Sequence, residues 1–177
     1  MKRSININAL IRPIIQTMQA YRSARLEFVE SDRKMILLDA NENPFDTGLN
    51  RYPDPMQTKL KERLGSVKHV DPSNIFLGNG SDELISLMMV AFCEPKKDEV
   101  LLVPPTFGMY QVSANLNGVD TVEVPLIADF QLNVPEILAR ATDHTKLVFI
   151  PTPNNPTGNR FPMKDLKAIV EGFPGLV

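Results

Sequence analysis

Hydrophobic and polar positions follow two different periods along most of the chain, and their alternation predicts the order of strands and helices. Apolar runs at residues 100–103 and 147–150 predict buried strands at residues 99–103 and 146–150, because a strand covered on both faces shows no polar alternation. Between these runs, alternating residues at 121–124 predict another strand. Strands separated by helices form a mostly parallel sheet, so the predicted class is α/β with helices on both faces of the sheet.

Apolar residues at helical spacing predict the connecting helices. We expect them at residues 56–64, 84–92, 107–117, 135–141 and 163–170. Gly118 marks the end of the third helix, and Pro135 suits the first turn of the fourth. The short apolar run at residues 74–77 predicts one more strand.

Both ends of the chain depart from this pattern. A helix at residues 9–21 and a strand at residues 35–39 cannot bury their apolar sides alone, so residues 1–50 are expected to form an arm that lies on another surface. Residues 51–177 then form the main domain. Residues 173–177 resemble a turn that enters a strand without completing it, so we expect the chain to be the N-terminal part of a longer protein.

Composition narrows the class of partner. The 177 residues carry a formal net charge of −2 at pH 7, which argues against nucleic acid or an acidic membrane and favours small molecules. Cys93 is the only cysteine, so no internal disulfide forms, no metal site is expected, and a cytoplasmic location is the natural interpretation. No apolar stretch approaches the length of a membrane span.

Three loops that follow predicted strands carry candidate chemistry. In the first, residues 78–83, glycines allow a tight turn, and Ser81 or Asp82 can open a helix whose free N–H groups favour an anion such as phosphate. The alternative is a capped turn with no ligand. A Rossmann fingerprint needs glycine where Glu83 stands, and the chain lacks the Gly-Lys-Ser/Thr of a P-loop.

The loop at residues 151–158 gives the strongest prediction of a binding site. It follows a buried strand, so it lies at the carboxyl edge of the sheet, where open α/β folds bind ligands. Its prolines stiffen the backbone and let an asparagine present its amide to a ligand, although a plain turn has a similar composition. A third loop, at residues 104–110, carries Phe107, which can stack on a planar ring or simply pack in the core.

The order of five short motifs resembles the fold-type-I aminotransferases that depend on pyridoxal phosphate, and is most similar to the histidinol-phosphate aminotransferases. The motifs are Asn41-Glu42-Asn43-Pro44, Arg51-Tyr52-Pro53, Gly80-Ser81-Asp82-Glu83, Pro105-Thr106-Phe107-Gly108-Met109-Tyr110 and Asn154-Asn155-Pro156-Thr157-Gly158. The resemblance implies an N-terminal arm plus an incomplete large domain of this fold.

The resemblance also implies roles for individual residues. Backbone N–H groups of Ser81 and Asp82 would hold the phosphate of pyridoxal 5'-phosphate, Phe107 would stack on its ring, and Asn155 would bond its phenolic oxygen. Tyr52 would reach the cofactor of a neighbouring subunit, which implies a homodimer. Many family members have tyrosine where Phe107 stands, a change that keeps the stacking and removes a hydroxyl. Two weaker candidates for substrate contact are Tyr21 and Asn43.

The activity implied is transfer of an amino group from glutamate to imidazole-acetol phosphate in histidine biosynthesis. The chemistry needs a lysine that forms a Schiff base with the cofactor. The resemblance places that lysine beyond Val177, so this chain contains no catalytic residue and is expected to be inactive alone. Two alternatives are a non-catalytic phosphate-ligand or dimerisation module, and a related decarboxylase of a phosphorylated amino acid.

Overall fold

A computed structural model describes residues 5–21, 36, 38 and 40–177 of the chain. Contacts divide the described residues into two compact units. One contains residues up to Met18 together with Gly78–Val177, and the other contains residues between Gln19 and Leu77. The sequence suggested a boundary at residue 50, whereas the contacts divide the chain after Met18 and after Leu77. The domain limits of the protein remain a prediction.

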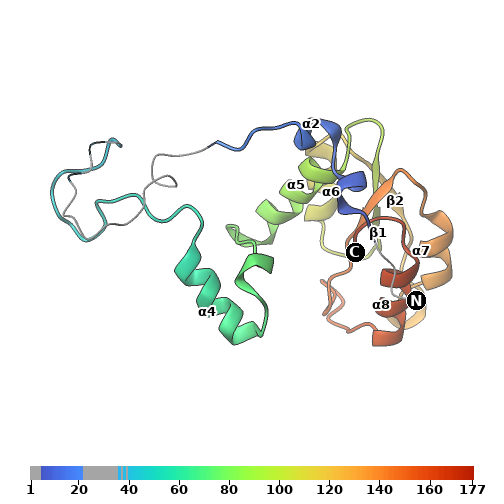
Figure 1. Ribbon diagram of the computed structural model, residues 1–177. Helices are drawn as coiled ribbons and strands as arrows, with labels where there is room; N and C mark the ends of the chain where they lie inside the picture. Colours follow the sequence, from blue (N-terminus) through green and yellow to red (C-terminus); the bar gives the residue numbers. More distant parts are fainter. Residues whose placement is uncertain (1–4, 22–35, 37, 39) are drawn as a thin grey trace. The chain divides into compact units, whose positions relative to one another are not determined.

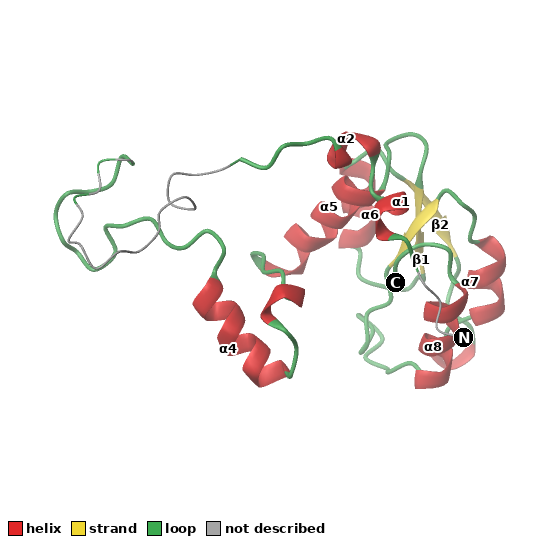
Figure 2. Cartoon of the chain, viewed as in Figure 1, coloured by secondary structure: helices red, strands yellow, loops and turns green. Residues whose placement is uncertain are grey.

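The first unit is built on a parallel sheet of three strands (Figure 2), which are β1 (Glu99–Leu102), β2 (Asp120–Glu123) and β3 (Thr145–Val148). Their order is β2-β1-β3, and β1 pairs in parallel with both neighbours. The strands predicted at residues 99–103, 121–124 and 146–150, and their parallel arrangement, are therefore confirmed. Since β1 is central, its side chains are buried on both faces, which explains its continuous apolar sequence.

Helices cover both faces of this sheet (Figure 1). Val100 and Leu102 point to a core shared with α5 (Gly80–Phe92) and α6 (Met109–Leu116). Leu101 and Val103 point to the opposite core, which α7 (Val134–Arg140) and α8 (Met163–Gly172) complete. Alternate residues of one strand thus serve two cores, and the expected helices on both faces are confirmed.

The chain ends where the sequence predicted a turn into a strand. Leu176 forms a parallel bridge with Leu147 of β3, and its carbonyl accepts a hydrogen bond of 2.9 Å from the N–H of Val148. Gly175 lies so close to this strand that an added Cβ would stand 2.1 Å from the carbonyl oxygen of Lys146. Only glycine fits this approach.

The expected helix at residues 9–21 is wrong. The arm instead forms two short helices, α1 (Ile7–Leu10) and α2 (Pro13–Gln16). Pro13 starts the second helix, and Arg12 before it has an extended backbone with φ −56° and ψ 139°. Proline disfavours helical geometry in the preceding residue, so a single helix cannot continue through this position.

In the second unit, helix α4 spans Thr58–Lys68 and is followed by a 3-10 turn, η1 (Pro72–Asn74). The strand expected at residues 74–77 is wrong, since none of residues 74–77 lies in a strand and Phe76 is 69% exposed. A strand needs a partner for its backbone, and no described segment pairs here. The strand expected at residues 35–39 lies largely outside the described residues.

A second 3-10 turn, η2 (Ala128–Phe130), links β2 to α7. None of the helices within the described ranges is both long and apolar enough to cross a membrane.

Candidate functional site

The loops after β1 and β3 meet at the carboxyl edge of the sheet, because these strands are adjacent and parallel. Asn154, which is 3% exposed, joins them. Its Nδ2 donates to the carbonyl of Pro105 at 2.9 Å, and its Oδ1 accepts from the hydroxyl of Thr106 at 3.1 Å. Two of the three predicted loops are therefore in direct contact.

Phe107 lies in the loop after β1, half-buried against the core of α5 and α6. Its ring meets Tyr110 edge-on, with 5.6 Å between ring centroids, and Tyr110 stacks on Phe149 at 4.7 Å. Burial raises the pKa of Tyr110. Phe107 thus packs partly in the core. A pocket of about 200 Å³ lies beside it, with Gln111 and Glu123 in its wall.

Ser81 and Asp82 lie in the first turn of α5, and both are exposed. The helix is preceded by Asn79, whose side chain makes no capping hydrogen bond. The backbone N–H of Asn79 donates to the carboxylate of Glu83, which leaves the first-turn N–H groups unoccupied by either side chain. Gly80 has φ +79°, and no atom lies within 4 Å of the position that a Cβ would take. The space next to the first turn of α5 is therefore empty at this residue.

The start of α5 is directed toward the carboxyl edge of the sheet. At the other end of the helix, the N–H of Glu94 donates to Asp98, which immediately precedes β1, at 2.8 Å. Helix α5 therefore runs against the direction of the strands. Among the described residues, however, no hydrogen bond joins Ser81 or Asp82 to the other two loops, and neither residue lines the pocket beside Phe107. Asn155 is exposed and does not line it either.

The remaining predicted site residues, Tyr21, Asn43 and Tyr52, belong to the second unit. Tyr21 is 87% exposed and Tyr52 59%. The side chain of Asn43 accepts a hydrogen bond of 3.0 Å from the N–H of Phe45, so it stabilises its own turn. The backbone N–H of Tyr52 donates to Glu42 at 2.8 Å.

Sequence reasoning missed two residues that organise these segments, Asn154 and Glu42. Asn154 was included in its motif without a role, because adjacent asparagines do not reveal which one faces inward. Glu42 was likewise part of a motif, and its side chain is only 3% exposed. A buried carboxyl requires partners, but the burial of Glu42 shows only in the structure, so the sequence carried no signal for its role.

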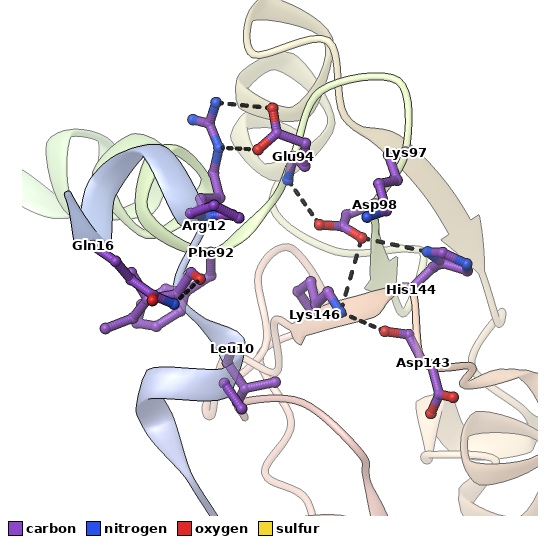
Figure 3. Close-up of a pocket in the computed structure, with 13 residues that line it drawn as sticks. Leu10, Arg12, Gln16, Phe92, Glu94, Lys97, Asp98, Asp143, His144 and Lys146 are labelled. Carbon is purple, nitrogen blue, oxygen red and sulfur yellow. Dashed lines mark hydrogen bonds and ion pairs between the residues drawn. The ribbon is translucent and has the colours of Figure 1, made fainter.

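A second pocket of about 480 Å³ lies by the opposite, amino edge of the sheet (Figure 3), where the arm meets the end of α5. Arg12 donates from Nε to Glu94 at 3.1 Å and from a terminal nitrogen to the carbonyl of Val90 at 2.8 Å. Asp98, 5% exposed, has His144 Nδ1 at 3.5 Å and Lys146 Nζ at 3.9 Å from its Oδ1. None of the predicted site residues lines this pocket.

Cys93 is buried near this edge and is 1% exposed. Burial raises the pKa of its thiol to about 12, and the negative charge of Asp98 adds to the increase. The thiol is therefore a core group rather than a nucleophile.

Comparison with known proteins adds a family match. The model of the family described as "Aminotransferase class I and II" matches residues 33–174. A curated histidinol-phosphate aminotransferase from Christiangramia forsetii is 49% identical over 175 residues, which are 99% of this chain and 50% of that protein. The chain spans about half the length of the curated relatives it matches.

Solved structures share the fold. An N-succinyldiaminopimelate aminotransferase from Mycobacterium tuberculosis has a TM-score of 0.63 and 29% identity, covering 70% of this chain and 35% of its own. A histidinol-phosphate aminotransferase from Sinorhizobium meliloti, solved in complex with pyridoxal-5'-phosphate, has a TM-score of 0.62 and 24% identity. That match covers 70% of this chain and 33% of the other.

Proposed function

Because the chain belongs to the aminotransferase class I and II family, we propose that the full-length protein is a histidinol-phosphate aminotransferase that uses pyridoxal 5'-phosphate. It transfers an amino group between glutamate and imidazole-acetol phosphate, giving histidinol phosphate and 2-oxoglutarate, in histidine biosynthesis in the cytoplasm. The observation that carries this proposal is the identity of nearly half of all positions, across almost the whole chain, with a protein of that name.

The first turn of α5 holds the cofactor phosphate through the backbone N–H groups of Ser81 and Asp82. Two observations support the fit: these groups have no side-chain cap, and the space above Gly80 is open. Free N–H groups and the helix dipole both favour an anion here. Asp82 is exposed, so its carboxylate can turn toward water and away from the phosphate.

Phe107 stacks on the pyridine ring, and Asn155 donates a hydrogen bond from its amide to the phenolic oxygen. This assignment is supported by the hydrogen bonds that join their two loops and by Tyr110, whose ring packs nearly perpendicular to the Phe107 ring and helps to hold it. When bound, the cofactor supplies an electron sink for the α-carbon of the amino acid. These side chains orient the cofactor, and aromatic stacking of this kind contributes about 0.5–1.5 kcal/mol beyond burial.

The proposal includes a homodimer in which Tyr52 of one subunit reaches the cofactor phosphate of the other, and in which Tyr21 and Asn43 contact substrate. The exposure of Tyr52 and the fixed position of its backbone support this role. An exposed tyrosine whose backbone is fixed is well suited to contact a partner, since little freedom is lost on binding.

An amino-transfer assay on the full-length protein tests the proposal. With pyridoxal phosphate present, histidinol phosphate and 2-oxoglutarate should yield glutamate, and phenylalanine or aspartate as amino donor should yield much less. Release of carbon dioxide from threonine phosphate, with no glutamate formed, would instead identify a decarboxylase. Absence of both reactions in a folded sample would favour the non-catalytic module.

A further inference from the structure

Asn154 differs from every other residue of the candidate site in being both buried and polar. It is 3% exposed, and all four of its polar groups have partners. Its backbone N–H donates to the carbonyl of Asn159 at 2.8 Å, and its own carbonyl accepts from Gly158 at 2.8 Å, so the loop closes on itself. Asn154 thereby fixes the conformation of the segment that contains Asn155.

The side-chain amide connects this closed loop to the loop after β1. Its Nδ2 donates to Thr157 Oγ1 at 2.6 Å and to the carbonyl of Pro105, 49 positions earlier in the sequence. Its Oδ1 accepts from the hydroxyl of Thr106. Donor and acceptor are both used, so neither aspartate, which lacks the donor, nor leucine, which lacks both, can replace the amide.

These bonds couple two residues with proposed roles on the cofactor. Asn155 follows Asn154 directly, and Phe107 follows the Pro105-Thr106 pair that the amide holds. A shift of the Asn154 side chain therefore moves the loop of Phe107 relative to the loop of Asn155. Ligand groups held in the bound geometry beforehand lose less freedom on binding, so such a connection raises affinity without touching the ligand.

We propose that Asn154 is a positioning residue that sets the geometry between Phe107 and Asn155, and through it the affinity for pyridoxal phosphate. This inference rests on the function proposed above. It assigns no contact between Asn154 and the cofactor, because both N–H donors of the amide bond to Pro105 and Thr157 and its oxygen accepts from Thr106.

The test uses the full-length protein and measures the dissociation constant of pyridoxal phosphate by absorbance titration. Asn154→Asp keeps the size of the side chain and removes the donor, and affinity should fall about tenfold to a hundredfold. Thr106→Val should weaken binding in the same direction, and Thr106→Ser, which keeps the hydroxyl, should restore it. The visible absorption band of the bound cofactor should shift in Asn154→Asp and Thr106→Val alone.

Asn117→Ala is the matched control. Asn117 is also partly buried, and its Nδ2 donates to Ser113 at 2.8 Å and to Ser86 at 3.4 Å, yet it ends α6 at the opposite edge of the sheet. This variant should lower the melting temperature while leaving the dissociation constant and the absorption band unchanged. Equal changes in affinity for Asn154→Asp and Asn117→Ala would mean a merely structural role and would overturn the inference.

A double-mutant cycle with Asn155→Ala separates this inference from the proposed function. If Asn154 acts through Asn155, the two changes together should weaken binding less than the product of their separate effects. Independent effects would contradict positioning through Asn155. Failure of the unaltered full-length protein to bind the cofactor would overturn the proposed function together with this inference, whereas unchanged affinity in Asn154→Asp would overturn this inference alone.

Discussion

The buried carboxylate of Glu42 accepts a hydrogen bond from the backbone N–H of Tyr52 at 2.8 Å across ten positions of sequence. Its second oxygen accepts from Arg51 at 2.5 Å. One side chain thus joins the Asn-Glu-Asn-Pro and Arg-Tyr-Pro motifs within the second unit. These bonds hold the backbone of Tyr52 in place. Tyr52 itself is 59% exposed.

Glu42→Ala should loosen this segment. The N–H of Tyr52 loses its acceptor, so its hydrogen exchange should become about tenfold faster or more, consistent with about 1.5–3 kcal/mol for a hydrogen bond to a charged group. Glu62→Ala is the control, since Glu62 is exposed on α4. Exchange at Tyr52 that is equally fast in the original protein and in Glu42→Ala would show that the carboxylate does not hold this segment.

Phe107→Ala should weaken binding of pyridoxal phosphate by about threefold to tenfold, because an aromatic pair contributes about 0.5–1.5 kcal/mol. Phe107→Tyr should bind nearly as well as the original, since stacking is retained. The measurement is a dissociation constant on the full-length protein. Affinity that is the same in all three proteins would contradict stacking by Phe107.

Cys93 gives a prediction about pH. Burial raises the pKa of its thiol from 9.0 to about 12, so between these pH values the folded protein keeps the proton that the unfolded chain releases. The contribution to stability is complete below about pH 9 and is lost as pH rises toward 12. Cys93→Ala should flatten the fall in melting temperature across this window, and native Cys93 should react with a thiol reagent at pH 8 about a thousandfold more slowly than an unfolded chain.

Gly175→Ala should destabilise the protein by about 1–3 kcal/mol, because the added Cβ would meet the backbone of β3 at Lys146. Gly108→Ala is the matched control. Gly108 has an ordinary helical backbone with φ −63°, and no atom lies within 4 Å of its Cβ position. Its free energy of unfolding should change by less than about 0.5 kcal/mol. Denaturant unfolding of both variants gives the comparison, and similar losses would mean that Gly175 is not constrained by β3.

The sequence predicted the fold best where the hydrophobicity of a segment matches its burial in the folded protein. Residues 100–102 are all apolar and lie in the central strand, buried on both faces, so their hydrophobicity indicates their position directly. Residues 74–77 have a similar apolar character, but a strand also needs a partner, which hydrophobicity cannot supply. The prediction of one helix at residues 9–21 was wrong for another reason, since Pro13 prevents the continuous helix that the apolar spacing suggests.

For the candidate site, the sequence pointed to loops and motifs, whose roles stay predictions. Turn residues after buried strands pointed to the loops around Phe107 and Asn155, and the parallel sheet brings these two loops together. The sequence could not reveal that Asn154 connects them, because this contact spans 49 positions and depends on the register of β1 against β3. Side-chain hydrogen bonds of this kind are set by tertiary structure and not by local pattern.

A crystal structure of the full-length protein with bound pyridoxal phosphate tests the central claim most directly. The account predicts phosphate oxygens about 2.7–3.2 Å from the backbone nitrogens of Ser81 and Asp82, with the ring of the cofactor against Phe107. A phosphate bound away from the first turn of α5, or a ring that does not touch Phe107, would contradict it.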